Sequence, residues 1–234
     1  MFNSIIGSLG NFVVTETKTR QIELASICNF IGFWVYGFSA ICFIVLFQPF
    51  ITLWIGSNQL IDNFTMILIV MNFYFAGQRA TIHNFKLAGG IFKQDQFIPI
   101  IQSVINIIFS ILFVQTYGLA GVYIGTFLSS LLPNFYRPYV VYKYLFETSI
   151  KIYLKKYIRE IVFLSISVIL IIFITRPLAM DITWMKFFLL AILTVALSNL
   201  LIVIVYRKTP EMEYLRKEFL KIIERIKYGK STAR

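Results

Sequence analysis

The sequence is poor in charge, in acidic groups and in side chains that perform chemistry. Only 14% of the residues are charged, eleven are acidic, and His83 is the single histidine. The chain has no H-E-x-x-H, no G-x-x-x-x-G-K-S/T, no G-x-S-x-G and no paired acidic cluster, so the common metal, phosphate-loop and nucleophile motifs are missing. We therefore expect a protein that is not an enzyme and that holds no cofactor or metal.

Cysteines and targeting signals are equally scarce. Cys28 and Cys42 lack the spacing of a metal-binding or redox pair and lie in or beside an apolar segment, so we expect them to act as small apolar residues. Residues 1–25 show neither the basic start nor the small-residue cleavage site of a signal peptide. Insertion into a membrane is therefore expected to depend on the first long apolar segment.

Apolar residues make up 58% of the chain, against about 45–50% in a soluble domain. They gather into six segments of membrane-spanning length, about 20 residues each. Because a helix satisfies its own backbone hydrogen bonds in lipid, each segment can cross a bilayer. The sequence predicts an all-α, polytopic membrane protein with about six transmembrane helices, at residues 30–55, 64–84, 98–117, 119–142, 158–175 and 184–206.

Along the chain, connections that contain many Lys and Arg residues alternate with connections that contain few. Only two of the 22 Lys and Arg residues fall in one alternate set of connections, at residues 56–63, 118 and 176–186. Because Lys and Arg are retained on the cytoplasmic side, we expect a multi-pass protein of the bacterial cytoplasmic membrane with both termini in the cytoplasm. The net charge of +11 then faces anionic membrane lipids rather than nucleic acid.

We expect one domain in three parts: an amphipathic cytoplasmic connector at 1–29, a six-helix transmembrane domain at 30–206, and a basic amphipathic cytoplasmic tail at 207–234. In the tail, Thr209-Pro210 is typical of a helix start. Apolar residues then recur at helical spacing, at Leu215, Phe219, Ile222, Ile223 and Ile226. This pattern favours a helix lying on the inner leaflet, and a docking site for a partner is the alternative.

Polar side chains form stripes on the second, third and fourth segments. The three stripes are Asn72, Arg79 and His83; Gln102, Asn106 and Ser110; and Thr126, Ser130, Asn134 and Arg137. Because charged and polar groups in spans often face a cavity, the stripes favour a shared aqueous cleft. The candidate substrate-binding residues are Arg79, Asn72, His83, Asn106 and Arg137. The alternatives are snorkelling of Arg79, interfacial packing of His83 and hydrogen bonds between helices.

The fourth segment also contains Pro133 and Pro138, which are expected to kink or break it, as in the broken helices of transporters. The spacing Gly121-x-x-x-Gly125 predicts a close approach to another helix. The fifth and sixth segments are almost purely Ile, Leu, Phe and Val, so we expect them at the periphery, facing lipid.

Four runs of sequence, in this order and spacing, carry a family resemblance. They are QPFITLWIG at 48–56, NFYFAGQRATIHNFKLAGGIFKQDQFIPI at 72–100, INIIFSILFVQTYGLAGVYIGTFLSSL at 105–131 and RPYVVYKYLF at 137–146. Together they resemble bacterial polysaccharide (O-antigen, Wzx-like) flippases of the MOP superfamily. The chain is similar to the C-terminal lobe of these two-lobed proteins, and GSLGNFVVTETKTR at 7–20 resembles the connector that enters that lobe.

The resemblance implies a function in polysaccharide, O-antigen and lipopolysaccharide biosynthesis. Such flippases move an undecaprenyl-pyrophosphate-linked oligosaccharide to the outer leaflet by alternating access, coupled to an ion gradient. The resemblance implies that the spans with Trp34 and Arg79 line the cleft, and Arg79 matches the Arg of the family's NFY-x-x-G-x-R segment. The implied partners are the lipid-linked oligosaccharide and either a separate N-terminal lobe or the polysaccharide polymerase machinery.

Two other functions remain open. The chain could be a non-transporting membrane subunit, or the inactive remnant of a split flippase gene. It could also be a multidrug exporter of the same superfamily, which would be expected to have acidic residues in its spans for cation coupling. The acidic residues of this chain lie mostly in loops and in the tail, and we expect none within the spans, which disfavours the exporter.

Overall fold

The computed structural model describes residues 6–229, and side chains for 8–224. These residues form α-helices, one short 3-10 turn (η2, Ser57–Gln59) and no strand, so the predicted all-α fold is confirmed. The helices are α1 (Ile6–Thr15), α2 (Lys18–Trp54), α3 (Asn63–Ala88), α4 (Ile98–Tyr117), α5 (Leu119–Tyr144), α6 (Lys151–Ala179), α7 (Trp184–Tyr206) and α8 (Pro210–Gly229).

Four of these helices, α2, α4, α6 and α7, are long and apolar enough to cross a membrane. Helices α3 and α5 have 26 residues each, but they are not among the four, and they carry two of the three polar stripes. The expected segments at 98–117 and 184–206 match α4 and α7 residue for residue. Helix α2 begins at Lys18, so it runs through the boundary expected at residue 29 without a break.

Side-chain caps explain where several helices begin. Asp62 precedes α3 and accepts hydrogen bonds from the Thr65 hydroxyl at 2.5 Å and the Thr65 amide at 2.8 Å. These two bonds favour the carboxylate and hold the pKa of Asp62 below its ordinary value. Thr209 accepts a bond from the Met212 amide at 3.4 Å, and α8 begins at Pro210. The helix start expected at Thr209-Pro210 is thus confirmed.

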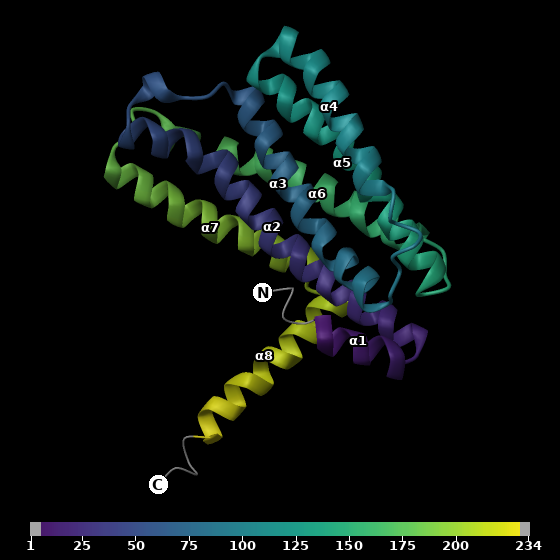
Figure 1. Cartoon of the computed structure of the whole chain (residues 1–234). Coiled ribbons are helices and arrows are strands. Elements are labelled where there is room, and N and C mark those ends of the chain that lie inside the picture. Colours follow the sequence, from purple (N-terminus) through teal and green to yellow (C-terminus); the bar gives the residue numbers. More distant parts are fainter. Residues whose placement is uncertain (1–5, 230–234) are drawn as a thin grey trace.

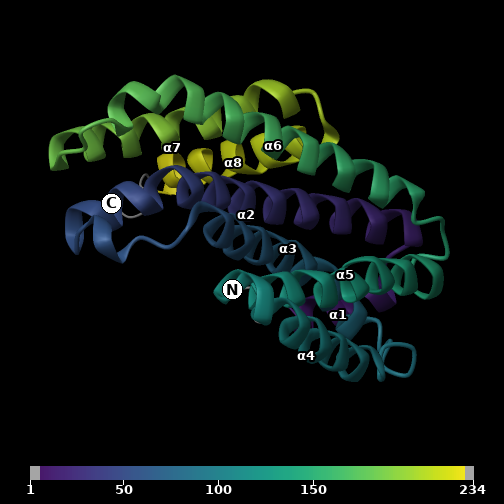
Figure 2. The ribbon, with the colours of Figure 1, turned by 90° about the horizontal axis from the view of Figure 1, so that it is seen from above.

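Helix α2 lies between two groups of helices (Figures 1 and 2). On one side are α3, α5 and α4, which we call the α3–α5 half, and on the other are α6 and α7, the α6–α7 half. A buried core joins α2 to the α6–α7 half through Phe33, Ile41, Ile171, Leu190 and Ile202. A second core surrounds the ends of α3 and α5 and the start of α6. The molecule is therefore built around one long central helix.

The α3–α5 half has a tight helix pair as its outer edge. Gly118, at a positive φ of 55°, turns the chain between α4 and α5. A Cβ atom added at Gly121 would collide with the Phe113 backbone, and one at Gly125 with the Ser110 backbone. The predicted close approach is confirmed, with α4 as the neighbour. Helix α4 has only one buried residue, Ile98, and packs mainly on α5.

Helix α5 runs unbroken through Pro133 and Pro138, which corrects the expectation that a break could occur there. A proline removes one backbone donor and displaces the carbonyl of the preceding turn. In that turn the Ser130 carbonyl accepts a hydrogen bond from the Arg79 guanidinium, with an Nη1–O distance of 3.2 Å. The carbonyl that Pro133 leaves without a helical donor is that of Ser129, and Arg79 of the adjacent helix bonds the carbonyl next to it.

The α6–α7 half presents a narrow buried stripe to α2 and leaves its other faces apolar and exposed. Small polar residues in the stripe, such as Thr194 and Ser198, donate to carbonyls of their own helix at 2.7 Å. Outward-facing residues such as Phe173 and Ile192 are 74% and 65% exposed. An exposed apolar surface of this kind is what a lipid-facing helix requires.

Helix α8 points away from the bundle in Figure 1. Its expected apolar face includes Phe219, Ile222 and Ile223, and all three side chains are exposed. The Ile226 side chain lies outside the described residues, as do the two ends of the expected connector and tail, 1–5 and 230–234.

Candidate functional site

The three polar stripes face one another rather than a common opening. Asn72 of α3 donates to the Tyr123 carbonyl of α5 at 3.1 Å. Asn106 of α4 donates to the hydroxyls of Thr126 and Ser129 of α5 at 3.2 and 3.4 Å. These contacts are the interhelical hydrogen bonds that the sequence left open as an alternative to a cleft. Asn72 and Asn106 therefore join helices at separate places along the bundle.

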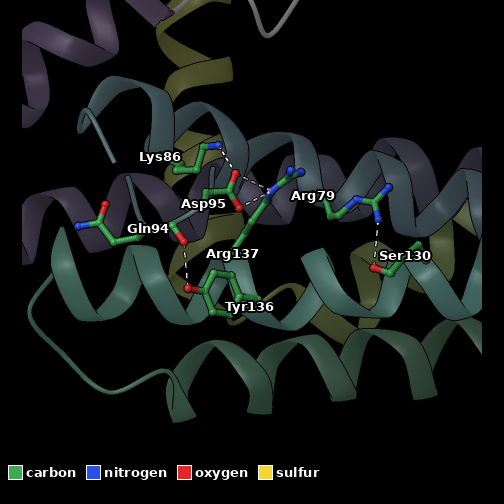
Figure 3. Close-up of polar contacts among 7 residues, drawn as sticks. All are labelled: Arg79, Lys86, Gln94, Asp95, Ser130, Tyr136 and Arg137. Carbon is green, nitrogen blue, oxygen red and sulfur yellow. Dashed lines mark hydrogen bonds and ion pairs between the residues drawn. The ribbon is translucent and has the colours of Figure 1, made fainter. Parts of the chain in front are cut away.

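The strongest polar cluster forms where α3 and α5 meet the loop between α3 and α4. Asp95 of this loop is 3% exposed and forms an ion pair with Lys86 of α3. The Nε atom of Arg137 of α5 lies 3.2 Å from both Asp95 carboxylate oxygens. Figure 3 shows both cations converging on the carboxylate. The cluster thus ties two helices and their loop together.

The backbone conformation of the loop between α3 and α4 places Asp95 between Lys86 and Arg137. Gly90 takes a positive φ of 66° just after the end of α3, and the Ile91 amide then bonds the Lys86 carbonyl at 3.0 Å. The Tyr136 hydroxyl donates to the Gln94 carbonyl at 3.0 Å (Figure 3). The loop consequently folds back against α5 and directs Asp95 into the interface.

Arg79 belongs to the same interface but has a different environment. It is half-buried, and its side chain points to the Ser130 carbonyl in Figure 3. Among the described residues it forms no ion pair. His83 lies one turn further along α3, and its Nδ1 atom is buried without a hydrogen-bond partner. Arg79 is therefore a cation that no carboxylate of the described residues neutralises.

The cluster has an excess of positive charge. Arg79, Lys86 and Arg137 supply three cations, and Asp95 supplies one anion. An Arg guanidinium can bind two oxygens of a phosphate at once. The arrangement consequently leaves net positive charge at Arg79, while Asp95 pairs with Lys86 and Arg137.

The structure brings together Arg79, His83 and Arg137 of the five predicted residues, and leaves Asn72 and Asn106 elsewhere. Lys86 and Asp95 complete the cluster and were not predicted. A signal for Lys86 was present, since it follows Arg79 and His83 at i+7 and i+3 on the same face of α3. Asp95 had a weaker signal, as the one acidic residue in the loop after α3.

The cavities lie on the other side of α3, next to α2 and α6. An apolar groove of about 440 Å³ runs between α2, α3 and α6, and a second cavity of about 720 Å³ continues it toward Arg176. A third, polar cavity of about 20 Å³ surrounds Glu160. None of the five predicted side chains lines these three cavities, because their stripes are packed between α3, α4 and α5.

No protein-family model, curated protein or solved structure matches this chain. The flippase family therefore stays a prediction that rests on the resembling segments.

Proposed function

We propose that α2 to α7 form a six-helix transmembrane domain that helps move an undecaprenyl-pyrophosphate-linked oligosaccharide across the bacterial cytoplasmic membrane. Helices α3 and α5 would complete the six, because 26 residues reach about 39 Å at 1.5 Å per residue, more than the ~30 Å hydrocarbon core. Their polar side chains bond one another instead of facing lipid, which makes a span tolerable. An even number of spans also agrees with the alternation of Lys and Arg along the chain.

The observation that carries the proposal is the unneutralised guanidinium of Arg79 within a cluster of excess positive charge. A pyrophosphate carries several negative oxygens, and a partly buried Arg binds them more strongly than an exposed one would. The cluster lies at the end of α3 and α5 that the charge pattern assigns to the cytoplasm, where the carrier lipid would be loaded. Asp95 would keep Lys86 and Arg137 in position.

The resemblance to one lobe of a two-lobed flippase makes a second lobe the expected partner. Alternating access needs two bodies that move against each other, and a single lobe offers only one wall of the path. We therefore propose that the chain works with an N-terminal lobe, and that the polysaccharide polymerase machinery receives the product.

Replacement of Arg79 in cells tests the proposal. A strain without the gene would be complemented with the wild-type chain, Arg79→Ala, Arg79→Lys or Arg176→Ala, at equal protein level. Arg176 is an exposed arginine at the other end of the bundle, so its variant is the matched control. We expect Arg79→Ala to lose most surface polysaccharide, Arg79→Lys to keep part of it because it lacks the bidentate geometry, and Arg176→Ala to be normal.

A binding measurement tests recognition of the pyrophosphate group separately from transport. Purified protein in lipid nanodiscs would be titrated with undecaprenyl pyrophosphate and with uncharged undecaprenol. We expect Arg79→Ala to weaken binding of the pyrophosphate about tenfold or more, the equivalent of roughly 1.4 kcal/mol, and to leave undecaprenol unchanged. Normal polysaccharide together with unchanged pyrophosphate binding in Arg79→Ala would reject the proposal.

One observation favours the multidrug exporter as a second candidate. Glu160 lies inside the fifth predicted span and is 6% exposed, so the sequence argument that the spans lack acidic residues was wrong. Drug susceptibility of the deletion strain distinguishes the two functions. Loss of an exporter should increase drug susceptibility and leave surface polysaccharide normal. Loss of a flippase should reduce surface polysaccharide and leave drug susceptibility unchanged. A non-transporting subunit predicts neither, and a neighbouring gene that encodes a complementary lobe would argue for a split transporter.

A further inference from the structure

Side chains from α2, α3, α5, α6 and the start of α8 surround the polar cavity of about 20 Å³. A cavity of this size has room for one water molecule. Helix α2 contributes Ser26 and Asn29, α3 contributes Gln78, and α6 contributes Glu160. None of Arg79, Lys86, Asp95 and Arg137 lines this cavity, so it is distinct from the Asp95 cluster.

Glu160 is the buried acid of this cavity. Its Oε2 atom accepts a hydrogen bond from the Gln78 amide at 3.5 Å, and the same amide donates to the Tyr74 hydroxyl at 3.1 Å. Among the described residues, no ion pair includes Glu160. A charged carboxylate buried with one long hydrogen bond and no ion pair is far more costly than the neutral acid in the same place.

The two nearest cations are occupied elsewhere. Lys156 donates to the Glu211 carboxylate of α8 at 2.5 Å and to the Ser26 hydroxyl at 3.2 Å. The guanidinium of Arg159 lies 5.1 Å from the centre of the Tyr206 ring, and Arg159 itself is exposed. Both cations line the cavity without pairing with Glu160. They place positive charge near Glu160 at the wall of the cavity.

The other groups that face Glu160 are mostly phenols. Tyr74 comes from α3, Tyr153 and Tyr157 from α6, and Tyr206 from α7, while Glu211 of α8 is the second acid. From α2 the cavity receives the Asn29 amide, whose Oδ1 atom is buried and has no hydrogen-bond partner. An acceptor without a donor is a suitable partner for the hydroxyl of a neutral acid, either directly or through one water.

We propose that Glu160 is a proton-binding site, which is neutral in this conformation and exchanges its proton with the cytoplasmic side through the cavity. The proton forms an O–H bond with the carboxylate and returns to water when the site opens. A metal cation fits less well, because Lys156 and Arg159 line the same small space and would repel it. The proposal does not rest on the flippase function, because it concerns the protonation of Glu160 in the protein without substrate.

Infrared spectroscopy of the purified full chain in lipid nanodiscs tests the proposal. A protonated carboxyl group has a carbonyl stretching band distinct from that of a carboxylate. At neutral pH we expect this band in the wild type and in Glu213→Gln, whose residue is exposed on α8, and we expect its loss in Glu160→Gln. The band should disappear when the pH is raised far enough to ionise Glu160.

Two further measurements test whether the infrared band comes from a protonated Glu160. Gln78→Met removes the amide donor, so the band should persist but shift in frequency. Sodium added at constant pH and ionic strength, with choline as the replacement ion, should leave the band unchanged. Absence of the band at neutral pH in the folded wild type, its persistence in Glu160→Gln, or its loss on addition of sodium would each overturn the proposal, the last in favour of a metal-cation site.

Discussion

Asp95 and Glu160 are buried to similar degrees, 3% and 6% exposed, yet their surroundings are opposite. Asp95 lies between Lys86 and Arg137, whereas Glu160 has a long bond from Gln78 and no ion pair among the described residues. A buried charge is tolerated when it is paired, and a buried acid without a cation avoids the cost by keeping its proton. The comparison separates a carboxylate that holds helices together from one that can bind a proton.

The two halves of the bundle also differ in the contacts that hold their helices together. In the α3–α5 half, polar side chains such as Asn72 and Asn106 donate to the neighbouring helix. In the α6–α7 half, Thr194 and Ser198 donate to their own helix. Contact with α2 is mainly apolar, with one side-chain hydrogen bond from the Trp34 indole to Asn199 at 2.9 Å and one from Lys156 to Ser26 at 3.2 Å. The first half is therefore specified more by directional bonds within the bundle, and the second more by apolar contact.

Asp95→Asn should have the largest effect on stability. It leaves Lys86 and Arg137 buried beside a neutral group, and breaking a buried pair in this way costs about 3–5 kcal/mol. Unfolding by titration from mild detergent into SDS, followed by circular dichroism, measures the loss. Asp181→Asn is the control, because Asp181 is exposed and its positive φ of 47° suits Asn. Equal stability of the two variants would remove the structural role assigned to Asp95.

Gly125→Ala against Gly37→Ala compares the packing of the two halves. A Cβ at Gly125 meets the Ser110 backbone, while one at Gly37 meets the methyl groups of Leu164, which can move. We expect Gly125→Ala to cost about 1–3 kcal/mol, as overpacking does, and Gly37→Ala to cost less. The same SDS titration gives both values, and a reversed order would contradict the tighter packing of α4 against α5.

Asn106→Ala against Ser198→Ala compares the two kinds of hydrogen bond. Asn106 bonds across helices, so its loss should cost about 0.6 kcal/mol and at most about 1.7 kcal/mol, the range found for such bonds in membranes. Ser198 bonds its own helix, and we expect a smaller change because α7 keeps its backbone bonds. A loss from Ser198→Ala as large as that from Asn106→Ala would show that the contrast between the halves is not energetic.

Glu160→Gln should have the smallest effect on stability. Glutamine has the shape of a neutral glutamic acid and keeps an acceptor for the Gln78 amide, so the unfolding midpoint in SDS should stay close to that of the wild type. Glu160→Gln is thus the counterpart of Asp95→Asn, with the same chemical change at similar burial. A loss comparable to that of Asp95→Asn would mean that Glu160 is ionised and paired.

The ends of α4 and α7 were predictable because Gly118, Thr183 and Thr209 lie close to them in the chain. The start of α2 at Lys18 was not, since residues 18–29 are too polar to resemble a span although they continue its helix. The continuity of α5 through Pro133 and Pro138 was also missed, because a proline inside a helix locally favours a kink or break.

The sequence by itself determined the α-helices and four membrane-spanning candidates, because helix formation and apolar length depend on residues within a few turns of one another. It also placed Arg79, His83 and Lys86 on one face of α3. Only the tertiary structure paired Arg137 with Asp95, 42 positions apart, and brought Gln78 to Glu160, 82 positions away. Whether a buried carboxyl group is paired or left to bind a proton depends on which distant helix packs beside it, and no local pattern carries that information.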